Sequence, residues 1–144
     1  MVPESDVILV VDGAVEHNLK LSFADLARFP RHSLRATDEL GKESIFEGVL
    51  VAEILRSAGV KFGKELRGKR LADYLLVETA DSYRVVFALP ELDPTFKGAF
   101  VLLADSRDSG PLGETDGQLC LIIPFEKRYA RWVRHLVALH VKHS

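Results

Sequence analysis

The sequence contains a single cysteine, Cys120, so no internal disulfide can stabilise the fold and the cysteine content indicates no redox compartment. The five histidines and this cysteine also lack the spacing of a zinc site, and we expect each histidine to be structural or on the surface. Cys120 lies between Leu119 and Leu121 in an apolar run. We predict that it is a buried, small apolar residue, because a reactive thiol needs exposure and a lowered pKa.

Long apolar runs and an excess charge of one sign are missing as well. No apolar run approaches the roughly 20 residues of a membrane-spanning helix, and the first residues lack the basic start and long apolar core of a signal peptide. The sequence therefore predicts a soluble chain, cytoplasmic or periplasmic. Its 19 basic and 21 acidic residues give a formal charge of −2, which leaves no general positive field for a nucleic acid partner.

Familiar catalytic motifs are absent: there is no glycine-rich phosphate loop, no Ser/His/Asp order and no pair of glycosidase carboxylates. What the chain does have is a 47% hydrophobic content over 144 residues, which is typical of one globular domain, residues 1–144. Apolar, β-branched runs predict most of its structure. We expect strands or extended segments at residues 7–11, 14–21, 32–37, 45–48, 74–80, 83–89, 99–104, 119–123 and 135–143.

Helices are fewer than strands. Ser22 is a suitable N-cap for a helix over residues 22–29, and an apolar stripe closed by Gly59 predicts a second helix over residues 48–60. Residues 61–73 read as a solvated loop, and residues 90–98 as a turn or one helical turn. Tight turns at Asp12-Gly13 and Asp81-Ser82 predict two hairpins. Together these features indicate an α+β fold with mixed or mainly antiparallel sheets and a few short helices.

The last third of the chain carries the candidate site, because polar loops held between buried strands are where binding residues usually lie. Four carboxylates crowd this loop: Asp105, Asp108, Glu114 and Asp116. Crowded carboxylates are suited to acid–base work, and turn formation by aspartate is the alternative explanation.

A basic segment follows Pro124. Lys127, Arg131 and Arg134 recur at i, i+4 and i+7, so a helical turn would put three cations on one stripe. Guanidinium groups bind phosphate bidentately, and such a stripe would suit the phosphate of a nucleotide or pterin cofactor. A solvated basic face is the alternative. Trp132, inside the segment, is expected to pack in the core.

Four segments together resemble the molybdopterin-binding domain of sulfite-oxidase-like oxidoreductases, in its short stand-alone form. They are "LSFADLARFP", "FEGVLVAEILRSAGV", "ADSYRVVFALPEL" and the order "LLAD…SGPL…DG-L-LIIP…ARWVR". The third has Ser82 where the family has glycine. The resemblance runs from about Leu19 to Val141, and it implies the family's α+β fold with a groove that in the enzymes holds a molybdenum–pterin cofactor.

The resemblance also implies roles for residues of the candidate site. Arg131 matches an arginine, and Arg134 a lysine, in the segment that holds the pterin and its phosphate. By the same resemblance, Asp105, Asp116 and Gly117 belong to the loop that completes the cofactor site. The cations found from their spacing are therefore those that the resemblance indicates.

Two departures from the family bear on chemistry. The enzymes ligate molybdenum through a cysteine thiolate, and this chain has Asp38, Glu39 and Leu40 at that place. A catalytic tyrosine follows "LLA" in the enzymes, and this chain has Asp105. We therefore expect no sulfite-oxidase chemistry. Two functions follow: an oxidoreductase-like domain that binds molybdopterin, or a non-enzymatic module whose groove holds a small anion or a protein partner.

Overall fold

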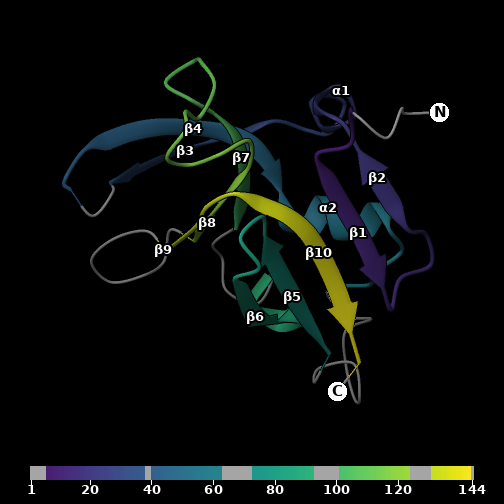
Figure 1. The fold of residues 1–144 in the computed structure, drawn as a ribbon. Coiled ribbons are helices and arrows are strands. Elements are labelled where there is room, and N and C mark those ends of the chain that lie inside the picture. The colour runs from purple at the N-terminus through teal and green to yellow at the C-terminus, as the bar shows by residue number, and fades with distance from the viewer. Residues whose placement is uncertain (1–5, 38–39, 63–72, 93–100, 124–130, 144) are drawn as a thin grey trace.

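The computed structural model describes residues 6–37, 40–62, 73–92, 101–123 and 131–143, with only the backbone of Arg131. In those ranges the chain forms ten strands in two five-stranded sheets, with three short helices (Figure 1). This arrangement confirms the predicted α+β class with mixed sheets. No helix in these ranges is long and apolar enough to cross a membrane.

The first sheet has the strand order β2-β1-β10-β5-β6. Its strands are β1 (Leu9–Gly13), β2 (Leu19–Leu21), β5 (Tyr74–Thr79), β6 (Arg84–Ala88) and β10 (Leu136–Lys142). β1 and β10 run parallel, with Val10 opposite Ala138, and the other neighbours are antiparallel. The last strand of the chain therefore lies in the centre of this sheet, between β1 and β5 (Figure 1).

The second sheet has the order β3-β4-β7-β8-β9 and is antiparallel throughout. Its strands are β3 (His32–Thr37), β4 (Glu43–Leu50), β7 (Leu102–Arg107), β8 (Cys120–Ile123) and β9 (Arg131–Val133). The loop between β7 and β8 therefore starts and ends on this sheet, and it lies at the top of Figure 1. This loop contains Asp108, Glu114 and Asp116, whereas Asp105 lies in β7.

One large apolar core joins the two sheets. Val77 and Leu139 of the first sheet, Leu103 and Leu121 of the second and Ile54 of α2 (Val51–Ser57) belong to it and are at most 1% exposed. Each such side chain contributes about 1.5–3 kcal/mol when fully buried, so this core is the main source of stability. A smaller core covers the other face of the second sheet around Phe46, Leu102, Cys120 and Ile122. β8 is thus buried on both faces.

The first predicted helix is confirmed as α1 (Phe23–Ala27). The Ser22 hydroxyl accepts a hydrogen bond from the Asp25 backbone N–H at 3.2 Å, and the Asp25 carboxylate accepts one from the Ser22 N–H at 3.0 Å. This capping box satisfies two backbone donors at the start of the helix. Leu26 is buried, whereas Phe23 stays 45% exposed. α3 (Leu89–Leu92) is a single helical turn at the start of the segment predicted as a turn or one helical turn, residues 90–98, of which residues 93–98 lie outside the described residues.

The predicted start of the second helix at residue 48 is wrong. Residues 48–50 extend β4, and helix α2 begins only at Val51. A Cβ on Gly48 would lie 1.9 Å from the carbonyl oxygen of Leu103, so only glycine permits β4 to approach β7 this closely. The predicted end is confirmed, because Gly59 follows α2 with a φ of +95°.

The first predicted hairpin is confirmed by the antiparallel pairing of β1 with β2, but its tight turn at residues 12–13 is wrong. Gly13 is the last residue of β1 and pairs with Val141, and the return strand β2 covers only residues 19–21. The hairpin of β5 and β6 is confirmed. At its tip Ser82 has a φ of +68°, the left-handed conformation that explains a glycine at the corresponding place in the resembling family.

Candidate functional site

A groove of about 750 Å³ opens between residues of both sheets. The side chains that line the groove include Phe23 of α1, Asp105 of β7, Leu112 and Glu114 of the β7–β8 loop, His135 before β10, and Val137 of β10. Phe23 and Val137 are 45% and 37% exposed, which is unusual for large apolar side chains. Concave sites with apolar walls and a few polar groups are where proteins usually bind ligands.

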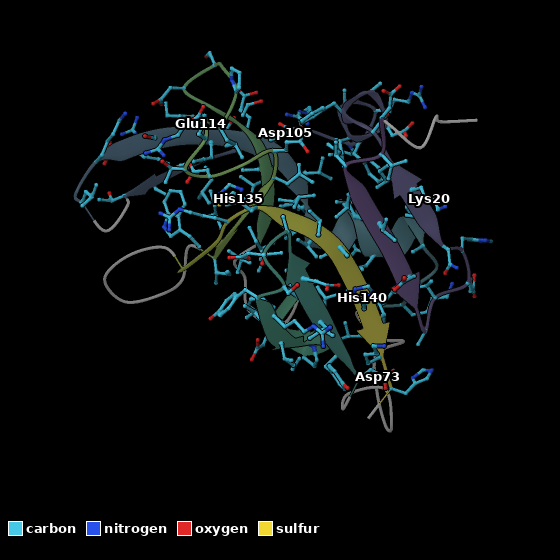
Figure 2. All side chains as sticks on the ribbon, viewed as in Figure 1. Lys20, Asp73, Asp105, Glu114, His135 and His140 are labelled. Atoms are coloured by element: carbon cyan, nitrogen blue, oxygen red, sulfur yellow. The ribbon has the colours of Figure 1, made fainter. Side chains whose placement is uncertain are left out.

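Two carboxylates, Asp105 and Glu114, are among the polar side chains that line the groove. Asp105, Glu114 and His135 gather at the upper end of β10 in Figure 2. No lysine or arginine is among the described residues that line the groove. Its charge therefore favours neutral or cationic ligands over anions.

Asp105 is held by an arginine that the sequence analysis missed. Arg31 donates two hydrogen bonds to the Asp105 carboxylate, at 2.9 and 2.6 Å, and the Ser106 hydroxyl donates a third at 3.0 Å. The hydrogen bonds to Asp105 raise the pKa of Arg31 above its ordinary value. This bidentate pair fixes the end of β7 to the start of β3 and neutralises Asp105.

Asp116 is not exposed to the groove but is the centre of a buried ion-pair cluster. Its carboxylate, 1% exposed, accepts hydrogen bonds from Arg107 Nη1 at 2.8 Å and from Arg134 Nε at 3.0 Å. Arg107 also donates to the Ser44 hydroxyl at 3.0 Å. A carboxylate buried this deeply needs such partners, because an unpaired charge would cost several kcal/mol.

Aromatic rings complete this Asp116 cluster. The guanidinium carbons of Arg107 and Arg134 lie 5.8 and 5.4 Å from the centre of the Trp132 ring, and that of Arg107 lies 5.1 Å from the centre of the Phe46 ring. Trp132 meets Phe46 edge-to-face at 4.8 Å and packs against the smaller core, as predicted. Both arginines are thus fixed by a carboxylate and by cation–π contacts.

The predicted basic helical stripe is wrong in its described part. Residues 131–133 form β9, which pairs with β8 so that Trp132 lies opposite Ile122 and Val133 opposite Leu121. Strand pairing with a buried neighbour has overridden the i, i+4, i+7 spacing of the cations. Lys127 and the side chain of Arg131 lie outside the described residues.

Gly117 gives the β7–β8 loop its path along β10. It has a φ of +84°, and a Cβ there would lie 2.5 Å from Nδ1 of His135. The backbone N–H of His135 donates to the carbonyl of Asp116 at 2.9 Å. The backbone carbonyl of His135 accepts a hydrogen bond from the N–H of Ala80, also at 2.9 Å. Gly117 therefore contributes to the groove by allowing close packing, not through a functional group.

The four carboxylates of the loop do not form one acid–base cluster. Asp105 pairs with Arg31, Asp116 lies in its own cluster, and Asp108 accepts a hydrogen bond from the Ile45 N–H at 2.9 Å. That backbone hydrogen bond lowers the pKa of Asp108. The turn-forming explanation is thus confirmed for Asp108, whose φ is +51°. Among the described residues, no group of three or more histidines, cysteines or carboxylates is suited to a metal ion.

Burial of Cys120 is confirmed. The side chain is fully buried in the smaller core, and burial, together with the nearby Asp116 charge, raises the pKa of the Cys120 thiol to about 12. A thiol of this kind is neither a nucleophile nor a metal ligand at neutral pH. It packs as a small apolar side chain.

The structure describes one of the two positions where the resemblance implies lost catalytic residues. At the tyrosine position, Asp105 pairs with Arg31, the residue before β3. Asp38 and Glu39, which stand at the place of the metal ligand, lie outside the described residues. The loss of both catalytic residues therefore stays a prediction.

A second polar cluster lies on the first sheet. His140 of β10 bridges two carboxylates, with its Nδ1 bonded to Asp12 of β1 and its Nε2 bonded to Glu78 of β5 at 2.9 Å. Burial lowers the pKa of His140, but the hydrogen bonds to Asp12 and Glu78 outweigh it and raise the pKa above its ordinary value. Because ionised carboxylates only accept, the imidazole can donate to both of them only in its protonated form.

Several residues of the groove were not predicted. Phe23 was expected in the apolar stripe of a helix and is instead an exposed wall, because α1 is short and only Leu26 is buried. His135 and Val137 were predicted as parts of a strand and not as residues of a site. A large aromatic residue directly after an N-cap, followed by only one helical turn, was the one available signal for an exposed ring.

Comparisons with known proteins show the fold. No family model matches the sequence, and no curated protein matches it. Among solved structures, the sulfane dehydrogenase SoxCD from Paracoccus pantotrophus is similar to this chain, with 22% sequence identity and a TM-score of 0.74. The similarity covers 100% of this chain and 40% of that chain. This chain thus shares the fold of a part of that dehydrogenase.

Proposed function

We propose that this chain is a non-enzymatic binding domain on the scaffold of sulfite-oxidase-like domains, and that it binds its ligand in the groove. The observation that supports this most is the Asp116 cluster. The cation that the resemblance assigns to a cofactor phosphate, Arg134, is a counter-ion of a buried carboxylate. What remains open to ligands is the groove of Phe23, Glu114 and Val137, which offers apolar area and carboxylate oxygens.

A molybdopterin cofactor is the second candidate, and the fold shared with a sulfane dehydrogenase is what favours it. The resemblance would place its pterin and phosphate at Arg131 and Arg134. The described residues do not fit this group: Arg134 is paired with Asp116, and the adjoining groove carries the exposed carboxylate of Glu114 without a lysine or arginine among its described lining. A polyanionic phosphate would meet negative charge there. We therefore assign no reaction to this cofactor.

The size of the groove suits a small ligand or part of a larger one. Binding sites for small molecules commonly measure about 300–1,000 Å³, and the groove falls in this range. Its walls come from α1, the β7–β8 loop and β10, so a ligand there would contact both sheets. Asp105 is neutralised by Arg31, which leaves Glu114 as the exposed charge of the groove.

The test is binding of three matched fragments, followed by NMR of the ¹⁵N-labelled protein. The fragments share a phenethyl group and end in an ammonium, an amide or a carboxylate. We expect the first two to shift the backbone amides of residues 112–118 and 135–137, with the carboxylate at least about threefold weaker because of Glu114. Val137→Arg should abolish these shifts, and Ile45→Arg, at 44% exposure on β4, should not. Shifts that avoid the groove would refute the proposal.

A further inference from the structure

The groove continues into a second hollow. This hollow measures about 370 Å³ and is lined by Asp6, Ile8, Ser22, Ala24 and the two residues that it shares with the groove, Phe23 and Gln118. Because both concavities use these same two side chains as walls, they adjoin across α1. Their lining includes residues of the β7–β8 loop, of α1 and of the first described segment, and these parts of the chain lie along the top of Figure 1. Two adjoining concavities can accept successive side chains of one extended chain.

Exposed apolar area lies in the middle of this surface. The ring of Phe23 is a wall of both concavities and is 45% exposed, and Val137 is exposed in the groove beside it. Exposed large apolar side chains that share one concave surface are typical of sites that bind apolar side chains of a partner.

Each of the two concavities carries an exposed carboxylate of its own. Glu114 lines the groove and Asp6 lines the second hollow, and both concavities share Phe23 and Gln118. Glu114 and Asp6 are both exposed. Among the described residues that line either concavity, none is a lysine or arginine. Complementary charge would therefore be positive at two points, one in each concavity.

We propose that this surface binds an extended peptide segment of a partner protein in which apolar residues are flanked on both sides by lysine or arginine. The proposal rests on the proposed function and adds the class of ligand to it. The apolar residues of the segment pack on Phe23 and Val137. The flanking cations pair with Glu114 and Asp6. Charge complementarity at two exposed carboxylates sets selectivity, and apolar burial supplies most of the affinity.

The experiment is selection of a random heptapeptide library against the intact protein, followed by anisotropy measurements on the selected peptides with a fluorescent label. We expect sequences with an apolar centre between basic residues. Phe23→Ala should weaken their binding at least about fivefold, as expected of an aromatic anchor. The control Ile45→Ala removes an apolar side chain of nearly equal exposure, 44%, outside this surface, and should leave binding unchanged.

Charge reversal tests the second half of the proposal. Glu114→Lys should weaken the basic peptides about two- to tenfold, and the loss should shrink in 0.5 M salt because exposed charges are screened. Glu91→Lys, at another exposed glutamate on α3, is the control and should have no effect. Selected peptides that are acidic or uncharged, or that bind Phe23→Ala and Glu114→Lys as well as the natural protein, would overturn the proposal.

Failure of this inference is distinguishable from failure of the proposed function. If no peptide is selected while the phenethyl fragments still shift residues of the groove, the groove binds a small ligand, and the peptide proposal alone is wrong. If neither the peptides nor the fragments bind there, both proposals are wrong.

Discussion

Arg31 and Asp105 are 74 positions apart in the sequence and form a bidentate ion pair with N–O distances of 2.9 and 2.6 Å. The pair joins the start of β3 to the end of β7, at one wall of the groove. The Asp105 side chain is only 9% exposed. The carboxylate that stands at the expected tyrosine position is therefore part of the structure that shapes the groove.

Loss of this pair should destabilise the protein. Arg31→Ala leaves the Asp105 carboxylate with its Ser106 hydrogen bond alone, and we expect a loss of about 1–2 kcal/mol in the free energy of unfolding, reduced because Arg31 is partly exposed. Urea unfolding followed by circular dichroism measures it. The control is Arg35→Ala, whose ion pair with Glu43 is exposed on both sides and should contribute less than about 0.5 kcal/mol. Equal losses in the two variants would contradict the structural role of Arg31.

Asp116 should matter more than any other carboxylate of its loop. Asp116→Ala removes the buried carboxylate that accepts hydrogen bonds from Arg107 and Arg134, and we expect a loss of about 3–5 kcal/mol, as for other buried pairs broken on one side. The emission of Trp132, the only tryptophan, should change as well, because both guanidinium groups lie over its ring. Glu114→Ala, in the same loop but exposed, is the matched control. If Asp116→Ala changes neither the free energy of unfolding nor the emission of Trp132, the Asp116 cluster does not stabilise the fold.

His140 should make stability depend on pH. Its pKa is raised in the folded protein, so its contribution is fully present below its ordinary pKa of about 6.5 and is lost as the pH rises through the raised value. The free energy of unfolding of the natural protein should therefore fall above pH 6.5 relative to that of His140→Gln. Arg84, which lies 3.9 Å from Glu78, is present in both proteins, so the comparison isolates the contribution of His140. The control is His143→Gln, a change at an exposed histidine, which should show the same fall in the free energy of unfolding as the natural protein. If the fall persists in His140→Gln, His140 is not its source.

Cys120 should be inert in the folded protein. Its thiol is buried and has a pKa of about 12, so a disulfide reagent at pH 8 should react only after unfolding. Because the chain has one cysteine, the labelling rate reports on this site alone. We expect labelling in minutes in 6 M guanidinium chloride, about the usual denaturing concentration, and at least about a hundredfold slower labelling without it. Rapid labelling of the folded protein would show a thiol that opens to solvent.

The parts of the fold that the sequence predicted are those with local signals. The capping box of Ser22 and Asp25, the alternation in β5 and β6 and the glycine after α2 each act within a few residues. The parallel pairing of β1 with β10 and the division into two sheets depend on contacts between distant segments, and no local pattern specifies them.

The candidate site was predicted in part, for the same reason. Asp105 and Gly117 do line the groove, because Asp105 lies near the end of β7 and Gly117 in the polar loop that follows this strand. The spacing of Arg131 and Arg134 suggested a helix, but the pairing of β9 with β8 decided the local structure. Arg134 pairs with Asp116, 18 residues earlier in the chain. This pairing depends on the burial of Asp116, which only the folded chain shows.

We propose that this chain, which resembles molybdopterin-binding domains, holds no molybdopterin. The most direct test of this proposal is the molybdenum content of the full chain purified from cells able to make molybdopterin, measured by elemental analysis together with pterin fluorescence after oxidation. The account predicts molybdenum and pterin far below one per chain. Stoichiometric molybdenum with pterin would contradict it.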